Sequence, residues 1–162
     1  MGNLEFTNHL IRGKIAEVIF QQMFREQGGY TIIPFGYEYT VPQLSQCTNS
    51  NRHAKRVIDN IKHSPDFALV SRDTQDVYLV EVKFRRRYSK RHASEEANLQ
   101  KERWDPSWIF YATLHDFYFD SCSSIVYNQG KAKSLSEKWI KSDIQQGYLE
   151  ILRDFETRKD DE

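Results

Sequence analysis

The chain has 162 residues, of which 28% are charged and 14% are aromatic. This length predicts one domain, 1–162, that can bury a core without a disulfide or a structural metal. Lysine and arginine together number 23, as do aspartate and glutamate, so the net charge is zero and a protein that is basic over its whole surface is excluded. Any anion-binding surface must therefore come from an uneven distribution of charge.

The sequence carries no signal for secretion or for a membrane. Its first residues, MGNLEFTNHL, lack a basic segment followed by an apolar core, and Phe6 stands where an N-myristoylation pattern requires Ser or Thr. No apolar run is long enough to span a bilayer. Cys47 and Cys122 are far apart and match no CxxC-type metal pattern. We therefore expect a soluble, intracellular, cytoplasmic protein.

The first expected elements are a helix and a strand. Apolar residues recur at helical spacing over 8–27, with Thr7 as the expected N-cap and Gly28 as the residue that ends the helix. Residues 30–41, YTIIPFGYEYTV, predict a strand or one arm of a hairpin. The polar stretch 43–56 predicts a loop.

A β-hairpin and a second long helix follow. After a short helix near 57–61, the segments 66–71 and 77–84 predict two strands joined by the polar turn RDTQD. A basic connection, RRRYSKRH, leads to a helix over 93–104, for which Ser94 is the expected cap.

The C-terminal part predicts further strands and one late helix. Strands are expected over 107–114, 117–119 and 123–128, a helix over 134–144, and a polar tail over 156–162. The aromatic residues of these strands are expected in the core. The order helix, strand, strand, strand, helix, strand predicts an α/β (α+β) fold, in which helices flank a mixed sheet.

Two charged residues interrupt an apolar strand. Glu81 and Lys83 lie two positions apart in 77–84, so their side chains project from the same face. If Asp66 opens the strand that pairs antiparallel with this one, the hairpin brings its carboxylate near Glu81. Two converging carboxylates repel each other, and a hard cation such as Mg²⁺ relieves that repulsion. With an adjacent lysine, these groups fit metal-assisted hydrolysis of a phosphodiester.

This arrangement resembles the motif of the PD-(D/E)xK nuclease superfamily, which includes restriction endonucleases and Holliday-junction resolvases. The matching residues are Pro65-Asp66, a hairpin-sized gap and Glu81-Val82-Lys83. The resemblance implies that Asp66, Glu81 and the Val82 carbonyl hold Mg²⁺ or Mn²⁺, and that Lys83 positions the attacking water.

The resemblance also implies a fold and further site residues. It covers about 7–114, which would form an αβββαβ, restriction-endonuclease-like core, and it leaves 115–155 as additional strands and a helix. Many members place a metal-site glutamate on the first helix, and Glu17 matches that position as both a catalytic and a metal-binding residue. Some carry a glutamine or lysine on the helix after the motif strand, where Gln100 or Lys101 could match.

A concentrated basic run follows the motif. Six Lys or Arg residues lie from Lys83 to Arg91, and no acidic residue interrupts them. Guanidinium groups bind phosphate in a bidentate manner, so this run predicts nucleic-acid binding. The superfamily acts mainly on DNA, which makes DNA the expected partner. The predicted nucleic-acid-binding residues are Arg85, Arg86, Arg87, Lys90, Arg91 and Gln100.

Other interpretations stay open. Glu81 and Lys83 can be an ordinary ion pair on a solvated face, and Asp66 can belong to a turn. A non-catalytic nucleic-acid-binding or protein-interaction module on the same scaffold is the main alternative, and a purely structural α/β domain is a third. Cleavage of both strands of a duplex would favour a homodimer. The sequence does not distinguish an endonuclease from an exonuclease.

Overall fold

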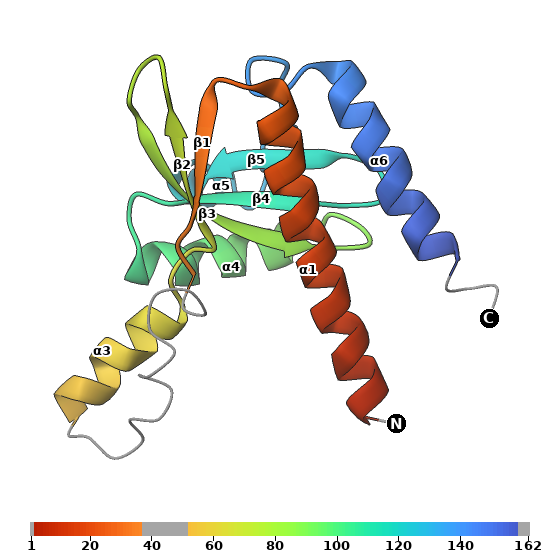
Figure 1. Ribbon diagram of the computed structural model, residues 1–162. Coiled ribbons are helices and arrows are strands. Elements are labelled where there is room, and N and C mark those ends of the chain that lie inside the picture. The colour runs from red at the N-terminus through yellow and green to blue at the C-terminus, as the bar shows by residue number, and fades with distance from the viewer. Residues whose placement is uncertain (1, 37–51, 159–162) are drawn as a thin grey trace.

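The computed structural model describes residues 2–36 and 52–158. One five-stranded sheet carries helices on both of its faces (Figure 1). In chain order the elements are α1 (Gly2–Gln27), β1 (Tyr30–Pro34), α3 (Arg52–Lys62), β2 (Phe67–Ser71), β3 (Val77–Phe84), α4 (Lys90–Arg103), β4 (Trp108–Ala112), β5 (Phe117–Ser121), α5 (Cys122–Tyr127) and α6 (Ser142–Thr157).

The sheet is mixed. Its strands follow the order β1-β2-β3-β4-β5, and β3 is parallel to β4 whereas the other neighbouring pairs are antiparallel. A parallel pair requires a crossover connection, which α4 provides. The predicted mixed α/β sheet flanked by helices is therefore confirmed. The hairpin of β2 and β3 is confirmed as well, and β3 has the predicted bounds.

The predicted N-cap of the first helix is wrong, because α1 begins before Thr7. Thr7 lies inside the helix, where its Oγ1 donates a hydrogen bond to the Asn3 carbonyl at 2.7 Å. The C-terminal end agrees with the prediction. Gly28 has a φ of +74°, and its N–H donates to the Phe24 carbonyl at 3.1 Å. Glycine adopts this left-handed conformation without a steric penalty, so the helix ends there.

Alternate residues of the strands face two separate hydrophobic layers. On β4, Phe110 and Ala112 pack in the layer that contains α1 and α6, whereas Ile109 and Tyr111 pack in the layer that contains α4 and α5. This alternation follows from the two-residue period of a strand. Phe20 of α1 is fully buried in the first layer. The aromatic residues of β4 belong to the core, as the sequence predicts.

The helix after β3 begins at Lys90, because its N-cap is Ser89 and not Ser94. Ser89 has an extended backbone (φ −127°, ψ 118°), and its side chain accepts a hydrogen bond from the His92 N–H at 3.4 Å. Lys90 and Arg91 are therefore in the first turn of α4 rather than in a basic connection.

Two elements of the C-terminal part differ from the prediction. Residues 123–128, predicted as a strand, lie mostly in α5, which Ser121 caps by accepting a hydrogen bond from the Ser124 N–H. The last helix is α6 rather than 134–144. It includes Glu156, which is 2% exposed, so residues 156 and 157 are not part of a polar tail.

The segment between β1 and β2 is described only in part. The strand predicted over 30–41 is confirmed over Tyr30–Pro34, and its residues from 37 onward lie outside the described residues, as does Cys47. The predicted loop 43–56 is helical from Arg52 onward, because α3 extends the short helix expected near 57–61. Among the described residues, no helix combines the length and apolar character needed to cross a membrane.

A prediction concerns Gly130, which packs against the start of α4. Gly130 has a φ of +90°, and a Cβ there would overlap the Lys90 carbonyl oxygen. We expect Gly130→Ala to destabilise the protein by about 2 kcal/mol or more, through strain and displacement of the helix. Urea unfolding followed by tryptophan fluorescence measures the change.

Gly147→Ala is the matched control. Gly147 lies in α6 with open space around the position of a Cβ, so alanine should stabilise the protein by about 0.5–1 kcal/mol. Equal stabilities for the two variants would contradict the close packing of Gly130 on α4.

Candidate active site

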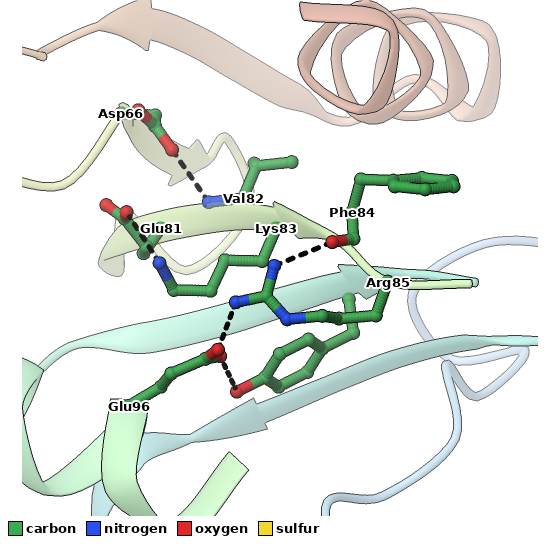
Figure 2. Close-up of polar contacts among 8 residues, drawn as sticks. Asp66, Glu81, Val82, Lys83, Phe84, Arg85 and Glu96 are labelled. Atoms are coloured by element: carbon green, nitrogen blue, oxygen red, sulfur yellow. Dashed lines mark hydrogen bonds and ion pairs between the residues drawn. The ribbon is translucent and has the colours of Figure 1, made fainter. Parts of the chain in front are cut away.

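The pairing of β2 with β3 brings three predicted site residues together. The strands are antiparallel with Phe67 opposite Val80, so the next position places Asp66 opposite Glu81. Lys83 projects from the same face of β3 as Glu81. Figure 2 shows the side chains of Asp66, Glu81 and Lys83 gathered at this end of the hairpin. The hairpin therefore produces the convergence that the motif spacing predicts.

Hydrogen bonds hold the two carboxylates in different ways. Asp66 Oδ2 accepts a hydrogen bond from the Val82 N–H at 2.7 Å. Glu81 Oε1 accepts from Lys83 Nζ at 3.4 Å, and the two side chains are 19% and 26% exposed. Asp66 is thus tied to the backbone of the neighbouring strand, whereas Glu81 is held by a flexible lysine (Figure 2). Glu81 is the carboxylate that can change partner more easily.

These groups lie in a cleft of about 390 Å³ that both helical layers reach. Glu17 of α1 lines it, and its Oε2 accepts from Lys14 Nζ at 3.1 Å. From α4, Glu96 and Gln100 line the same cleft. Lys101 is exposed and is not among the lining residues, so Gln100 is the one of the two alternatives that faces the cleft.

Two polar atoms of the cleft lack a protein partner within the described residues. Gln100 is 9% exposed, and its Nε2 makes no hydrogen bond. Ser64 lines the cleft two residues before Asp66, and its buried Oγ also makes none. Since buried polar groups are normally hydrogen-bonded, these two atoms can interact with a ligand or with solvent in the cleft.

The electrostatics of the cleft disfavour two ionised carboxylates. Burial, followed by the charge of Glu81, raises the pKa of Asp66 to about 8, although the Val82 N–H and Lys83 oppose the increase. Burial also raises the pKa of Glu81, against the opposing effect of Lys83. Glu17 adds negative potential at both groups. Lys83 therefore offsets only part of the cost of ionising both carboxylates.

The donor set fits a hard divalent cation. Proteins bind Mg²⁺ through one or two carboxylates, with water and substrate phosphate as the other ligands, and Asp66 and Glu81 supply two carboxylates. Within residues 2–36 and 52–158, no three Asp, Glu, His or Cys side chains lie close enough together to hold a metal. Glu17 is therefore a neighbour of the pair rather than a third member of a ligand cluster, and the Val82 carbonyl stays a predicted ligand.

Glu96 is a site residue that the sequence analysis missed. It accepts hydrogen bonds from Arg85 and from the Tyr111 hydroxyl, the latter at 2.8 Å. Arg85 also donates to the Phe84 carbonyl at 2.7 Å, so its guanidinium is held between strand and helix (Figure 2). Glu96 lies four residues before Gln100, on the same face of α4. That spacing was the available signal, since the predicted helix over 93–104 already contains both residues.

The predicted nucleic-acid-binding residues fall into two environments. Arg85 is half-buried against Glu96, and Arg86 forms an ion pair with the buried Glu156 at 3.4 Å. Three others, Arg87, Lys90 and Arg91, are exposed, and Arg91 pairs with Glu95 on the surface of α4. The run is therefore not one uniform solvated loop, since its first two arginines are held by carboxylates.

The function of the site has to be inferred from its geometry, because the comparisons with known proteins found no match. No protein-family model matches the chain, and the search of curated proteins finds no match. The convergence of Asp66, Glu81 and Lys83 in a cleft that α1 and α4 line is thus the observation on which a function can be based.

The raised pKa of Asp66 predicts that stability depends on pH. Without metal, the folded protein keeps a proton on Asp66 up to about pH 8, whereas the unfolded chain releases it near about pH 4. Stability should therefore fall as the pH rises between these values, by about 1 kcal/mol per pH unit. Thermal unfolding in EDTA across this range measures the slope.

Asp66→Asn should make this slope smaller, leaving the part that the raised pKa of Glu81 contributes, and should raise stability near pH 8, since the amide has no proton to lose. Asp73→Asn, which changes an exposed carboxylate of the turn between β2 and β3, is the matched control and should keep the wild-type slope. A wild-type slope in Asp66→Asn would show that other groups cause the pH dependence.

Proposed function

We propose that the protein is a metal-dependent nuclease that hydrolyses phosphodiester bonds in DNA. The observation that supports this most directly is the convergence of Asp66 and Glu81 across the hairpin, with Lys83 bonded to Glu81 inside a cleft. Two carboxylates in a buried position need a compensating cation, and a lysine beside them suits chemistry on a phosphate.

The architecture supports membership in the PD-(D/E)xK superfamily, with its restriction-endonuclease-like core. The chain order contains helix, three strands, helix and strand as α1, β1, β2, β3, α4 and β4, with α3 inserted between β1 and β2. The charged end of β3 lies at the centre of the mixed sheet, between β2 and β4. This arrangement agrees with the αβββαβ core that the motif implies.

Each residue of the cleft has a role in the proposed reaction. When bound, Mg²⁺ or Mn²⁺ supplies Lewis-acid polarisation of the phosphoryl group. Asp66 and Glu81 would hold the ion, with the Val82 carbonyl as a backbone ligand. Lys83 would leave Glu81 to orient the attacking water and offset negative charge that develops on the phosphate. Glu17 and Gln100 would shape the entrance from α1 and α4.

A non-catalytic nucleic-acid-binding or protein-interaction module is the second candidate. It is favoured by the absence, within the described residues, of three metal-binding side chains in one cluster. In that case Lys83 and Glu81 would remain an ion pair, and binding would not depend on metal. Metal titration and cleavage separate the two candidates.

Asp66→Asn should remove both metal binding and cleavage. We expect loss of the Mg²⁺ or Mn²⁺ signal in calorimetry and at least a 100-fold decrease in plasmid nicking, because one of the two carboxylates is lost. Asp73→Asn is the control and should match the wild type in both assays. Undiminished nicking by Asp66→Asn would rule out the assigned site, and a wild-type protein that binds no metal would favour the binding module.

Lys83→Ala should separate binding from chemistry. The variant should still bind the metal, since both carboxylates remain, but its cleavage rate should fall by about 100- to 1,000-fold because a group that stabilises the transition state is lost. Lys101→Ala removes an exposed lysine of α4 outside the cleft and should have little effect. Equal rates for the two variants would assign Lys83 to a structural ion pair.

A further inference from the structure

A second cavity, of about 460 Å³, lies beside the candidate active site. Three separate segments contribute polar and charged side chains to it: His9 and Arg12 of α1, Arg85 and Arg86 after β3, and His92 and Glu96 of α4. We call it the arginine cavity. Glu96 also lines the cleft that contains Asp66, so the two cavities meet at this side chain.

A buried carboxylate positions two of the arginines. The side chain of Glu156 in α6 is 3% exposed, and its Oε1 accepts a hydrogen bond from Arg12 Nε at 2.8 Å. Its Oε2 forms an ion pair with Arg86 Nε at 3.4 Å, without a hydrogen bond among the described residues. Both arginines thus contact Glu156 through Nε. An arginine carries five N–H donors, and Arg12 uses one of them in its hydrogen bond to Glu156. The guanidinium of Arg12 also lies over the Phe84 ring, with its Cζ 5.9 Å from the ring centre, in a cation–π contact.

The charge of the cavity favours an anion. Among the residues that the structure describes, three guanidinium groups lie against two carboxylates, Glu96 and Glu156, so positive charges outnumber negative ones. Ordering arginine side chains costs conformational entropy, and these are already held by protein partners. Pre-positioned guanidinium groups suit the oxygens of a phosphate, which they bind with directed, charge-assisted hydrogen bonds.

We propose that the arginine cavity binds a phosphate group of the nucleic-acid strand whose scissile bond lies in the adjacent cleft. The inference rests on the proposed function and adds a subsite to it. Glu96 lines both cavities, so the two positions are adjacent. His9 and Arg12, which belong to the first helix and lie far from the basic run in sequence, thereby become substrate contacts. The bound group is either a backbone phosphate or the phosphate at a strand end.

Binding of a labelled single-stranded DNA in EDTA, followed by fluorescence anisotropy, tests the subsite without metal or cleavage. Arg86→Gln removes a cavity arginine that is 54% exposed, and it leaves Arg12 on the buried Glu156, so the fold should survive. We expect about tenfold weaker binding. We also expect the slope of the logarithm of the binding constant against the logarithm of the salt concentration to be smaller by about one, the value for one phosphate contact. His9→Ala tests the α1 side of the cavity through an exposed residue and should also weaken binding.

Arg72→Gln is the matched control. Arg72 is an exposed arginine in the turn between β2 and β3, at the opposite end of β3 from Phe84. The variant Arg72→Gln should therefore bind DNA like the wild type. DNA strands with a 5′-phosphate, a 3′-phosphate or neither identify the source of the phosphate. A loss in Arg86→Gln that is equal for all three strands indicates a backbone phosphate, and a loss confined to one phosphorylated strand indicates that end.

The outcomes separate this inference from the nuclease assignment. If Arg86→Gln and His9→Ala both bind as Arg72→Gln does, or if the wild type does not bind the strands, the subsite is overturned. Cleavage that depends on Asp66 would leave the proposed function in place even then. Conversely, a specific loss of binding in Arg86→Gln, together with an absence of cleavage by the wild type, would keep the subsite and overturn the nuclease assignment.

Discussion

The antiparallel pairing of β2 with β3 is the constraint on which the candidate site depends. Its register sets Asp66 opposite Glu81, and the hydrogen bond from the Val82 N–H holds the Asp66 carboxylate immediately before the start of β2. A slip of one residue would turn Glu81 and Lys83 toward α1 and would move Val80 and Val82 out of the core. Burial of the two valines therefore keeps the charged pair on the opposite face.

This geometry also sets the electrostatic character of the cleft. Burial and a neighbouring carboxylate raise the pKa of Asp66, while one lysine, Lys83, only partly offsets the negative charge. The site can reach balance by keeping a proton or by taking up a cation. The proposed metal binding and the stability of the metal-free protein both depend on the energy of ionising this one pair of carboxylates.

Helices from both layers complete the region around the pair. Glu17 of α1 and Gln100 of α4 line the cleft, and Glu96 connects it to the arginine cavity. The ion pair between Arg12 and Glu156 joins the first helix to the last one beside that cavity. Because removal of one partner from a buried ion pair leaves an uncompensated charge, this contact links the stability of the α1–α6 layer to the position of the arginines.

The sequence by itself determined the local elements with strong patterns and the convergence of Asp66 with Glu81. The bounds of β3 and the helix end at Gly28 follow from residue type and short-range spacing. The short helix α5 was missed because its β-branched residues favour a strand, whereas the Ser121 cap and burial of its Cys122 and Ile125 side chains favour a helix.

Only the tertiary structure decided which charges meet. The pair of Arg12 and Glu156 spans 144 positions, and Glu96 meets Arg85 and Tyr111 only after α4 packs on the sheet. No local pattern encodes such contacts, because their energy depends on burial and on partners that the chain brings together from distant segments. The motif could therefore be predicted from the sequence, and the cavity beside it could not.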